Sequence, residues 1–402
     1  MNLQPRVALM TDSYNEVNGV ALTSQRFVEY ARERGLPFLC VRAGDSTRVD
    51  AEDSNGVCGV ELERGRLSFF IDRRQRHDLA LWRYRALVSS VFKSFKPDLV
   101  HITGPSDIGQ LGAYVAHIMR IPLVASWHTD LHKFGAHRLG RLLSFAPRVG
   151  RDWVEHLAER YCLDALVRFY KIPRCLLAPN EEIVKMLKAR TGKPVYVMRR
   201  GVDTNLFSPA RRQRDDQDFV IGYVGRLTPE KNVRLLVEIE HALIKAGRTG
   251  YRFLIVGDGY ERPWLERRMA RVQFTGMLTG EDLATAYANM DVFAFPSRTD
   301  TFGNVVLEAL ASGVPAVVTS DGGPKYLVKA GVTGLVARDD TDFIDSVMSL
   351  IGGGDLHRAM REQARRHAWA NCWDNVFDAV YRVYSECLAQ TSVPQLARAY
   401  AG

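Results

Sequence analysis

The sequence lacks long apolar runs, paired cysteines and repeats. No window reaches the roughly 18 apolar residues that a membrane helix needs, and Met-Asn-Leu-Gln-Pro-Arg leads directly into a short apolar run, so we expect neither a transmembrane anchor nor a signal peptide. The six cysteines form no Cys-x-x-Cys pair, so neither a zinc module nor a disulfide framework is legible, and we expect reduced thiols in the cytosol. No low-complexity tract or solenoid period occurs.

The composition is that of a folded globular chain. Hydrophobic residues make up 46% and charged residues 25% of 402 residues, which argues against disorder and fibrous designs. At about 100 to 200 residues per domain, this length predicts at least two domains.

The net charge of +8 is concentrated in one segment. Between Arg64 and Lys96, nine basic residues face two acidic ones, a local balance of +7. Apolar residues recur there at helical spacing: Leu81, Tyr84, Val88, Val91 and Phe95. This pattern is typical of an ordinary amphipathic helix, with peripheral contact to an anionic membrane at its inner face as the alternative.

Short apolar runs alternate with stretches of helical periodicity along the first half. They are RVALM from Arg6, LPFLCV from Leu36, PDLVHI from Pro97, PLVASW from Pro122 and DALVR from Asp164. Continuous apolar strands separated by helices predict a parallel sheet covered on both faces. We therefore predict an α/β, doubly wound domain over residues 1–206.

A charged, proline-containing stretch, FSPARRQRDDQD, begins at Phe207 and predicts an exposed connection. A second series of strands follows: FVIGYV from Phe219, RFLIV from Arg252, RVQF from Arg271, DVFAF from Asp291 and PAVV from Pro315. We predict a second Rossmann-like domain over 207–370. Residues 357–388 have helical period, with an apolar face of Trp369, Trp373, Phe377, Val380, Tyr381 and Tyr384, and we expect 371–402 to join the first domain.

Ligands of doubly wound folds bind at the carboxyl ends of the strands, so the loops there are the candidate sites. Arg226 and Lys231 follow the strand FVIGYV within GRLTPEK. Two cations on one such loop suit a diphosphate. From charge alone, the alternative that both are solvated cations of a surface loop is equally well supported.

The segment FPSRTDTFGNVVLEALASG predicts a helix that begins near residues 302–304 and is apolar nearly all round except for Glu308. A buried carboxylate needs a partner, and two vicinal ribose hydroxyls would serve because they donate hydrogen bonds that it accepts. Asp300 lies on the loop before this helix, beside its first amides. A sugar and its phosphates would bridge the two acids.

With these motifs the whole chain resembles the retaining GT-B glycosyltransferases of family GT4. Gly225, Arg226 and Lys231 are similar to the family's phosphate clamp, and Asp300 with Glu308 to its acid-x7-Glu motif, in which most members have Glu at the first position. The resemblance implies two Rossmann-like domains that face each other across a cleft.

The resemblance also implies roles for individual residues. Glu308 would bind the donor ribose, Asp300 the hydroxyls of the transferred sugar, and Arg226 and Lys231 the diphosphate. The other implied contacts are the amides of Phe302, Gly303, Asn304 and Val305 to the diphosphate, the main chain of Leu278 to the nucleobase, Gly19 to the donor phosphates from the first domain, and His128 to the transferred sugar and acceptor. Asn18 stands where most members have glycine, and the sequence alone also allows His128 to be a packed or capping residue.

Two patterns invite a metal interpretation, and we favour the simpler one for both. His128 and His132 are four residues apart, and Asp-x-Asp triplets occur at 216–218 and 340–342. No carboxylate follows the histidines at a zinc-ligand spacing, and the triplets are interpreted as solvated loops. Because Arg226 and Lys231 balance a diphosphate, we predict no metal and no cofactor.

We therefore expect a cytoplasmic, retaining, metal-independent glycosyltransferase. It would move a sugar from a UDP- or GDP-linked donor to an acceptor hydroxyl on a lipid, glycan or small molecule. A nucleotide-sugar epimerase with the GT-B fold is the alternative, since it would use similar phosphate contacts. A nucleic-acid-binding protein would explain the charge of +8, but no zinc module, RNP-like motif or basic repeat supports nucleic acid as a partner.

Overall fold

The computed structural model of the protein describes residues 4–16, 18–50, 53–65, 69–72, 75–128, 160–300 and 302–389. The chain divides into two compact units: unit 1 comprises residues 1–199 and 376–402, and unit 2 comprises residues 200–375. The sequence places these two boundaries at 206/207 and 370/371.

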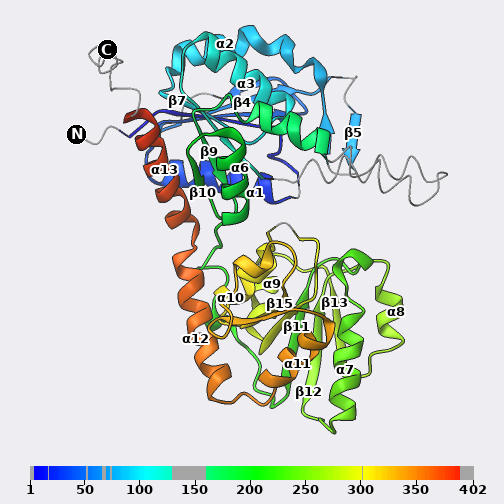
Figure 1. The fold of residues 1–402 in the computed structure, drawn as a ribbon. Helices are drawn as coiled ribbons and strands as arrows, with labels where there is room; N and C mark the ends of the chain where they lie inside the picture. The colour runs from blue at the N-terminus through cyan, green and yellow to red at the C-terminus, as the bar shows by residue number, and fades with distance from the viewer. Residues whose placement is uncertain are drawn as a thin grey trace, which may run out of the picture. The chain divides into compact units, whose positions relative to one another are not determined.

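Unit 1 contains an eight-stranded sheet with the order β10-β9-β8-β7-β1-β2-β4-β3 (Figure 1). All neighbouring strands are parallel except β3 and β4, which are antiparallel. The strands are β1 (Val7–Thr11), β2 (Phe38–Gly44), β3 (Arg48–Asp50), β4 (Val57–Glu63), β7 (Leu99–Ile102), β8 (Leu123–Ser126), β9 (Cys175–Ala178) and β10 (Val195–Val197). A separate hairpin pairs β5 (Phe69–Asp72) with β6 (Gln75–His77). The predicted strands before residue 130 are confirmed.

Three helices of unit 1 begin at a residue whose side chain caps the first turn. The helices of this unit include α1 (Gly19–Glu33), the 3-10 helix η1 (Leu79–Tyr84), α2 (Arg85–Phe95), α3 (Asp107–Ile118) and α6 (Glu181–Thr191). Asn18, Ser106 and Asn180 cap α1, α3 and α6 with side-chain oxygens. The strand predicted from Asp164 is wrong: residues 160–169 are helical, Leu163 and Leu166 pack against the core of unit 1, and Val167 is buried.

The apolar face of the basic segment packs into the protein. Three of its residues, Leu81, Val88 and Phe95, are less than a tenth exposed and belong to the core of unit 1. Tyr84 and Val91 on the same face are only partly buried, and a contact of this segment with an anionic membrane stays a prediction. In the part of the chain that the structure describes, no helix is long and apolar enough to cross a bilayer.

Unit 2 contains a six-stranded parallel sheet with the order β13-β12-β11-β14-β15-β16. The strands are β11 (Phe219–Val224), β12 (Tyr251–Val256), β13 (Val272–Gly276), β14 (Val292–Phe295), β15 (Ala316–Thr319) and β16 (Gly334–Ala337). The five strands predicted for this half are confirmed. Both sheets step outward from a central strand and then return to its other side, which is the doubly wound pattern.

Helices cover the sheet of unit 2 in two groups. The helix α7 (Leu235–Lys245) packs on α11 (Asp340–Leu350), whereas α10 (Asn304–Ala311) packs on α9 (Gly280–Ala288) and α12 (Asp355–Ala370) (Figure 1). Shorter elements are α8 (Arg262–Glu266) and the 3-10 helices η2 (Pro209–Arg211), η3 (Pro229–Lys231) and η4 (Pro324–Tyr326).

The C-terminal stripe of aromatic residues belongs to two helices. The chain leaves α12 at Ala370, and α13 (Trp373–Ala389) carries it from unit 2 into unit 1. Phe377 and Tyr384 are fully buried against Phe27 of α1, but Trp369 is 57% exposed. The prediction that Trp369 shares this core face is wrong because the break between the helices changes the phase of the repeat.

Candidate functional site

The strand order of unit 2 reverses between β11 and β14, and the predicted donor residues follow these two strands. The loop after β11, residues 225–231, is the clamp loop; the loop after β14, residues 296–303, leads into α10. Adjacent parallel strands that connect in opposite directions leave a crevice at their carboxyl ends. The two loops therefore lie at the position where doubly wound sheets bind ligands.

The main chain of the clamp loop packs against two glycines that follow β12. A Cβ atom on Gly257 would lie 2.0 Å from Gly225 O, and one on Gly259 would lie 2.3 Å from Leu227 O. Both glycines have positive φ, 131° and 157°. The Leu227 N–H donates to Asp258 O at 2.9 Å. The absence of side chains at these glycines lets the two loops approach closely, which fixes the clamp loop.

The structure brings two of the predicted side chains into direct contact. Lys231 Nζ donates to Asp300 Oδ2, and these side chains are only 14% and 26% exposed. Arg226, in contrast, is 61% exposed and lies 3.6 Å from Glu230. The cation assigned to the diphosphate and the acid assigned to the sugar thus neutralise each other, and an incoming anion would compete with Asp300 for Lys231.

The main chain around Asp300 is shaped by glycines. Asp300 O accepts from the Gly323 N–H at 2.7 Å, and a Cβ on Gly322 would lie 2.7 Å from the same oxygen. Gly303, with φ of 89°, is the N-cap of α10 and supplies no side-chain hydrogen bond to the first turn. A helix N-terminus without a side-chain cap suits an anion, which supports the predicted role of Asn304 and Val305 amides.

Glu308 has a protein partner that the sequence did not reveal. Tyr287 on α9 donates its hydroxyl hydrogen to Glu308 Oε2 at 2.8 Å. Burial raises the pKa of Glu308 to about 6, and the hydrogen bond from Tyr287 opposes this shift. Ribose hydroxyls are therefore not needed to satisfy the carboxylate, although a carboxylate has lone pairs for further donors.

Arg200 is a cation at this site that sequence reasoning missed. Its Nη1 donates to Asn304 Oδ1 at 3.5 Å, and its guanidinium lies 5.5 Å from the centre of the Phe302 ring. Burial lowers the pKa of Arg200 to about 10, against the opposing effect of the Asp300 charge, so Arg200 remains a cation at neutral pH. Its only signal in the sequence is a basic pair near the domain boundary, and the fold alone brings it to α10.

The turn assigned to the nucleobase follows β13, an edge strand of the sheet. Gly276 has φ of 73°, and its carbonyl accepts from the Gly257 N–H at 2.8 Å. The Leu278 side chain packs against the core of unit 2, whereas Met277 is 78% exposed. The packed Leu278 side chain anchors a turn whose contact with a base remains a prediction.

Gly19 belongs to unit 1, where it is the first residue of α1. The preceding Asn18 caps the helix: its Oδ1 accepts from Val20 N and Ala21 N, both at 2.9 Å, and its Nδ2 donates to Ser13 Oγ at 2.6 Å. Asparagine in place of the usual glycine therefore occupies two amides at the start of α1. A phosphate contact at Gly19 remains a prediction.

His128 also belongs to unit 1 and follows the buried strand β8. Its Nε2 lies 2.6 Å from Ser126 Oγ, at hydrogen-bonding distance. His132, the other member of the predicted histidine pair, lies outside the described residues.

In each Asp-x-Asp triplet an aspartate forms an ion pair with an arginine. Asp216 lies 3.3 Å from Arg252, and Asp340 lies 2.8 Å from Arg298. The interpretation of residues 340–342 as a loop is wrong, since Asp339 caps α11 and these residues form its first turn. In the part of the chain that the structure describes, no three His, Cys, Asp or Glu side chains converge to hold a metal.

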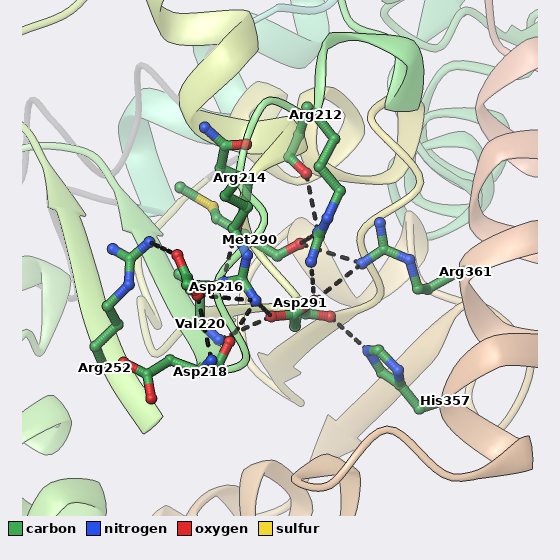
Figure 2. Close-up of polar contacts among 12 residues, drawn as sticks. Arg212, Arg214, Asp216, Asp218, Val220, Arg252, Met290, Asp291, His357 and Arg361 are labelled. Atoms are coloured by element: carbon green, nitrogen blue, oxygen red, sulfur yellow. Dashed lines mark hydrogen bonds and ion pairs between the residues drawn. The ribbon is translucent and has the colours of Figure 1, made fainter. Parts of the chain in front are cut away.

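A second charged cluster, drawn in Figure 2, surrounds Asp291 directly before β14 and so lies at the other end of the same strands. We call it the arginine brace: Arg212, Arg214 and Arg361 surround Asp291, at 2.8, 3.1 and 3.6 Å. The same guanidinium groups donate to carbonyls at the C-terminal end of α9, between residues 288 and 290. Arg212, Arg214 and Asp291 line a cavity of about 580 Å³. Its cations satisfy main-chain carbonyls that α9 cannot satisfy itself.

Comparison with known proteins covers most of the chain. Residues 17–206 match the model of Glycosyltransferase Family 4, and residues 218–353 match that of Glycosyl transferases group 1. A GDP-mannose-dependent alpha-mannosyltransferase from Mycolicibacterium smegmatis is 32% identical, over 96% of this chain and 99% of the relative. One from Mycobacterium tuberculosis is 31% identical, over 94% and 96%. A sulfoquinovosyl transferase from Arabidopsis thaliana is 27% identical, over 90% and 71%.

Solved structures share the fold at low sequence identity. A sucrose-phosphate synthase from Thermosynechococcus elongatus matches with a TM-score of 0.67 and 18% identity, over 96% of this chain and 99% of that chain. A glycosyltransferase from Rickettsia africae matches with a TM-score of 0.69 and 15% identity, over the same shares. At these identities the likeness concerns the fold alone.

Proposed function

Because this chain belongs to glycosyltransferase family 4, we propose that it is a GDP-mannose-dependent α-mannosyltransferase that retains the anomeric configuration and needs no metal ion. Family membership and the GT-B fold make it a hexosyltransferase. The choice of donor is supported by relatives from Mycolicibacterium smegmatis, Corynebacterium glutamicum and Mycobacterium tuberculosis, which are 30–32% identical and carry that name.

The observation that carries this proposal is the contact between Lys231 and Asp300 at the carboxyl ends of β11 and β14. Donor binding exchanges their partners: the diphosphate takes Lys231, and hydroxyls of the mannosyl group take Asp300. Arg226 and Arg200 add two further cations beside the diphosphate. Glu308 accepts hydrogen bonds from the ribose with the lone pairs that Tyr287 leaves.

Catalysis follows from charge that grows during the reaction. As the glycosidic bond to phosphate breaks, negative charge collects on the leaving GDP, and the three cations with the first amides of α10 bind it more tightly than they bind the intact donor. This differential binding lowers the barrier. The cations carry the charge balance that a metal would otherwise supply.

Retention requires that the acceptor hydroxyl attack from the face that the leaving group departs. A donor phosphate oxygen takes the acceptor proton, so no enzymic nucleophile is needed. His128 lies beside the transferred sugar and the acceptor in this proposal. The acceptor is a hydroxyl compound, and we seek it among lipids and glycans.

The test combines binding with product analysis. Because a ligand that binds only the folded protein raises its melting temperature, GDP-mannose should raise Tm more than UDP-glucose does. With acceptor present, the product should contain an α-mannoside, at an undiminished rate after exhaustive chelation. Equal shifts with every nucleotide sugar would remove the donor assignment, and an epimerised nucleotide sugar formed from donor alone would replace transfer with epimerisation.

A further inference from the structure

A chain of buried hydrogen bonds leads from the C-terminal helix to His128, entirely within unit 1. Tyr384 Oη on α13 lies 2.6 Å from His101 Nδ1, and His101 Nε2 lies 3.0 Å from Ser126 Oγ. Ser126 Oγ lies 2.6 Å from His128 Nε2. His101 and Ser126 occupy the apolar strands β7 and β8, and both are about 1% exposed, as Tyr384 is fully buried.

The direction of the protons follows from burial. Burial lowers the pKa of His101 to about 3, so its ring is neutral and has one donor and one acceptor nitrogen. Burial raises the pKa of Tyr384 well above its ordinary value, so its hydroxyl keeps its proton and donates it to His101 Nδ1. His101 Nε2–H then donates to Ser126 Oγ.

Ser126 completes the chain. Its hydroxyl, which accepts from His101, has two acceptors within reach: His128 Nε2 at 2.6 Å and the Ile102 carbonyl at 3.5 Å. The shorter contact is the better hydrogen bond. Donation to Nε2 leaves the proton of a neutral His128 on Nδ1.

We propose that Tyr384, His101 and Ser126 form a positioning relay that fixes the tautomer and ring orientation of His128. The proposal rests on the proposed function, because it gives the relay its purpose at the sugar-transfer site. None of the three side chains is assigned a contact with substrate. They act through His128. In this way the C-terminal helix α13 influences the tautomer of a residue that follows β8.

The same helix offers a matched control. Tyr381, one turn before Tyr384, is partly buried and packs against aromatic rings, and its buried hydroxyl oxygen has no hydrogen-bond partner in the described part of the chain. Tyr381→Phe and Tyr384→Phe thus remove the same atom from the same helix and the same packing layer. Only the second removes a hydrogen bond of the relay.

The test uses the full-length protein labelled with ¹⁵N-histidine. The imidazole signals of His128 are identified by their loss in His128→Gln. In Tyr384→Phe, we expect these signals to move away from the Nδ1–H tautomer and kcat to fall by about 2- to 10-fold with the donor KM within twofold, the size expected for one hydrogen bond. Tyr381→Phe should change neither.

Ser126→Ala is the second variant, since it cuts the link next to His128 and should give a larger change in both measurements. Unchanged His128 signals in Tyr384→Phe, or changed signals with wild-type kcat, would overturn the relay. Equal losses in the two tyrosine variants would assign the effect to packing. Because the spectra need no substrate, a failure of the proposed function leaves the relay itself measurable.

Discussion

The residues proposed to bind the donor and the arginine brace lie at opposite ends of the same strands and hold their cations differently. We call the first group, Arg200, Arg226, Lys231, Asp300 and Glu308, the donor cluster. In the brace, each guanidinium group combines the Asp291 carboxylate with main-chain carbonyls that cannot move away. In the donor cluster, Lys231 has one side-chain carboxylate as its partner, and Arg226 is mostly exposed. Cations held by the main chain stabilise the fold, whereas cations held by an exchangeable carboxylate are poised for a ligand.

Removal of the Lys231 cation should have the largest effect on activity. For Lys231→Ala we expect kcat to fall by about 10² to 10³, because the leaving diphosphate loses a preorganised positive charge. Steady-state kinetics with GDP-mannose measures this, and circular dichroism checks the fold. Arg361→Ala, in the brace, is the control that should keep kcat within a few fold. Near-normal turnover of Lys231→Ala would remove the distinction between the clusters.

Removal of the shared charge of the brace should affect stability instead. Asp291→Asn keeps the side-chain size but leaves three guanidinium groups without their common carboxylate, so we expect the free energy of unfolding to fall by about 3 kcal/mol. Urea denaturation measures the change. Turnover of the folded fraction should match that of the wild type, and a large loss of kcat without loss of stability would contradict the structural role.

Glu308 should make donor binding dependent on pH. Its pKa is about 6, so the carboxylate is ionised at pH 7 and takes up a proton as the pH falls through 6. Below that pH we expect the donor KM to rise by roughly tenfold per unit, as for a group that must be ionised. Glu308→Gln should have a high KM that stays flat across this window.

The same shift has a consequence for stability. Because burial raises the pKa of Glu308 from 4.5 to about 6, its contribution to stability is greatest below 4.5 and is lost as the pH rises through 6. Glu308→Gln should therefore gain stability relative to the wild type at pH 7 and not at pH 4. Urea midpoints at the two pH values measure this, and a difference of the opposite sign would show that the charged form is the favoured one.

Arg200 sharpens the boundary of the donor cluster. For Arg200→Gln we expect kcat/KM for the donor to fall by about tenfold, which corresponds to about 1.4 kcal/mol, as for one hydrogen bond to a charged group. Arg199→Gln removes the adjacent, exposed arginine and should change kcat/KM by less than twofold. If the two variants behave alike, long-range charge and not position explains the effect.

The smallest effect is expected at the rim of the brace. Asp216 is 43% exposed and pairs with Arg252. Asp216→Asn should lower the free energy of unfolding by about 0.5 kcal/mol, since solvent screens such pairs. Urea denaturation of Asp216→Asn and Asp291→Asn under the same conditions measures the difference between their free energies of unfolding. A loss as large as that of Asp291→Asn would mean that the exposed pair of Asp216 and Arg252 contributes as much stability as the central Asp291 carboxylate.

Much of the fold and part of the site follow from local sequence. The runs FVIGYV and RFLIV form strands as predicted, because continuous apolar segments between helices suit a sheet covered on both faces. The run DALVR forms a helix instead of the predicted strand. A run of five apolar-rich residues fits the period of either element, so its sequence does not decide between them. The predictions do not include the strands β9 and β10.

By itself the sequence determined the two series of strands and the loop residues that follow them, because apolar periodicity and glycine-rich turns are local properties. Only the tertiary structure decided which side chains meet. Tyr287 reaches Glu308, Arg200 reaches Asn304, and Tyr384 reaches His101 across 283 positions of sequence. These contacts depend on how distant elements pack, and no spacing along the chain encodes that distance.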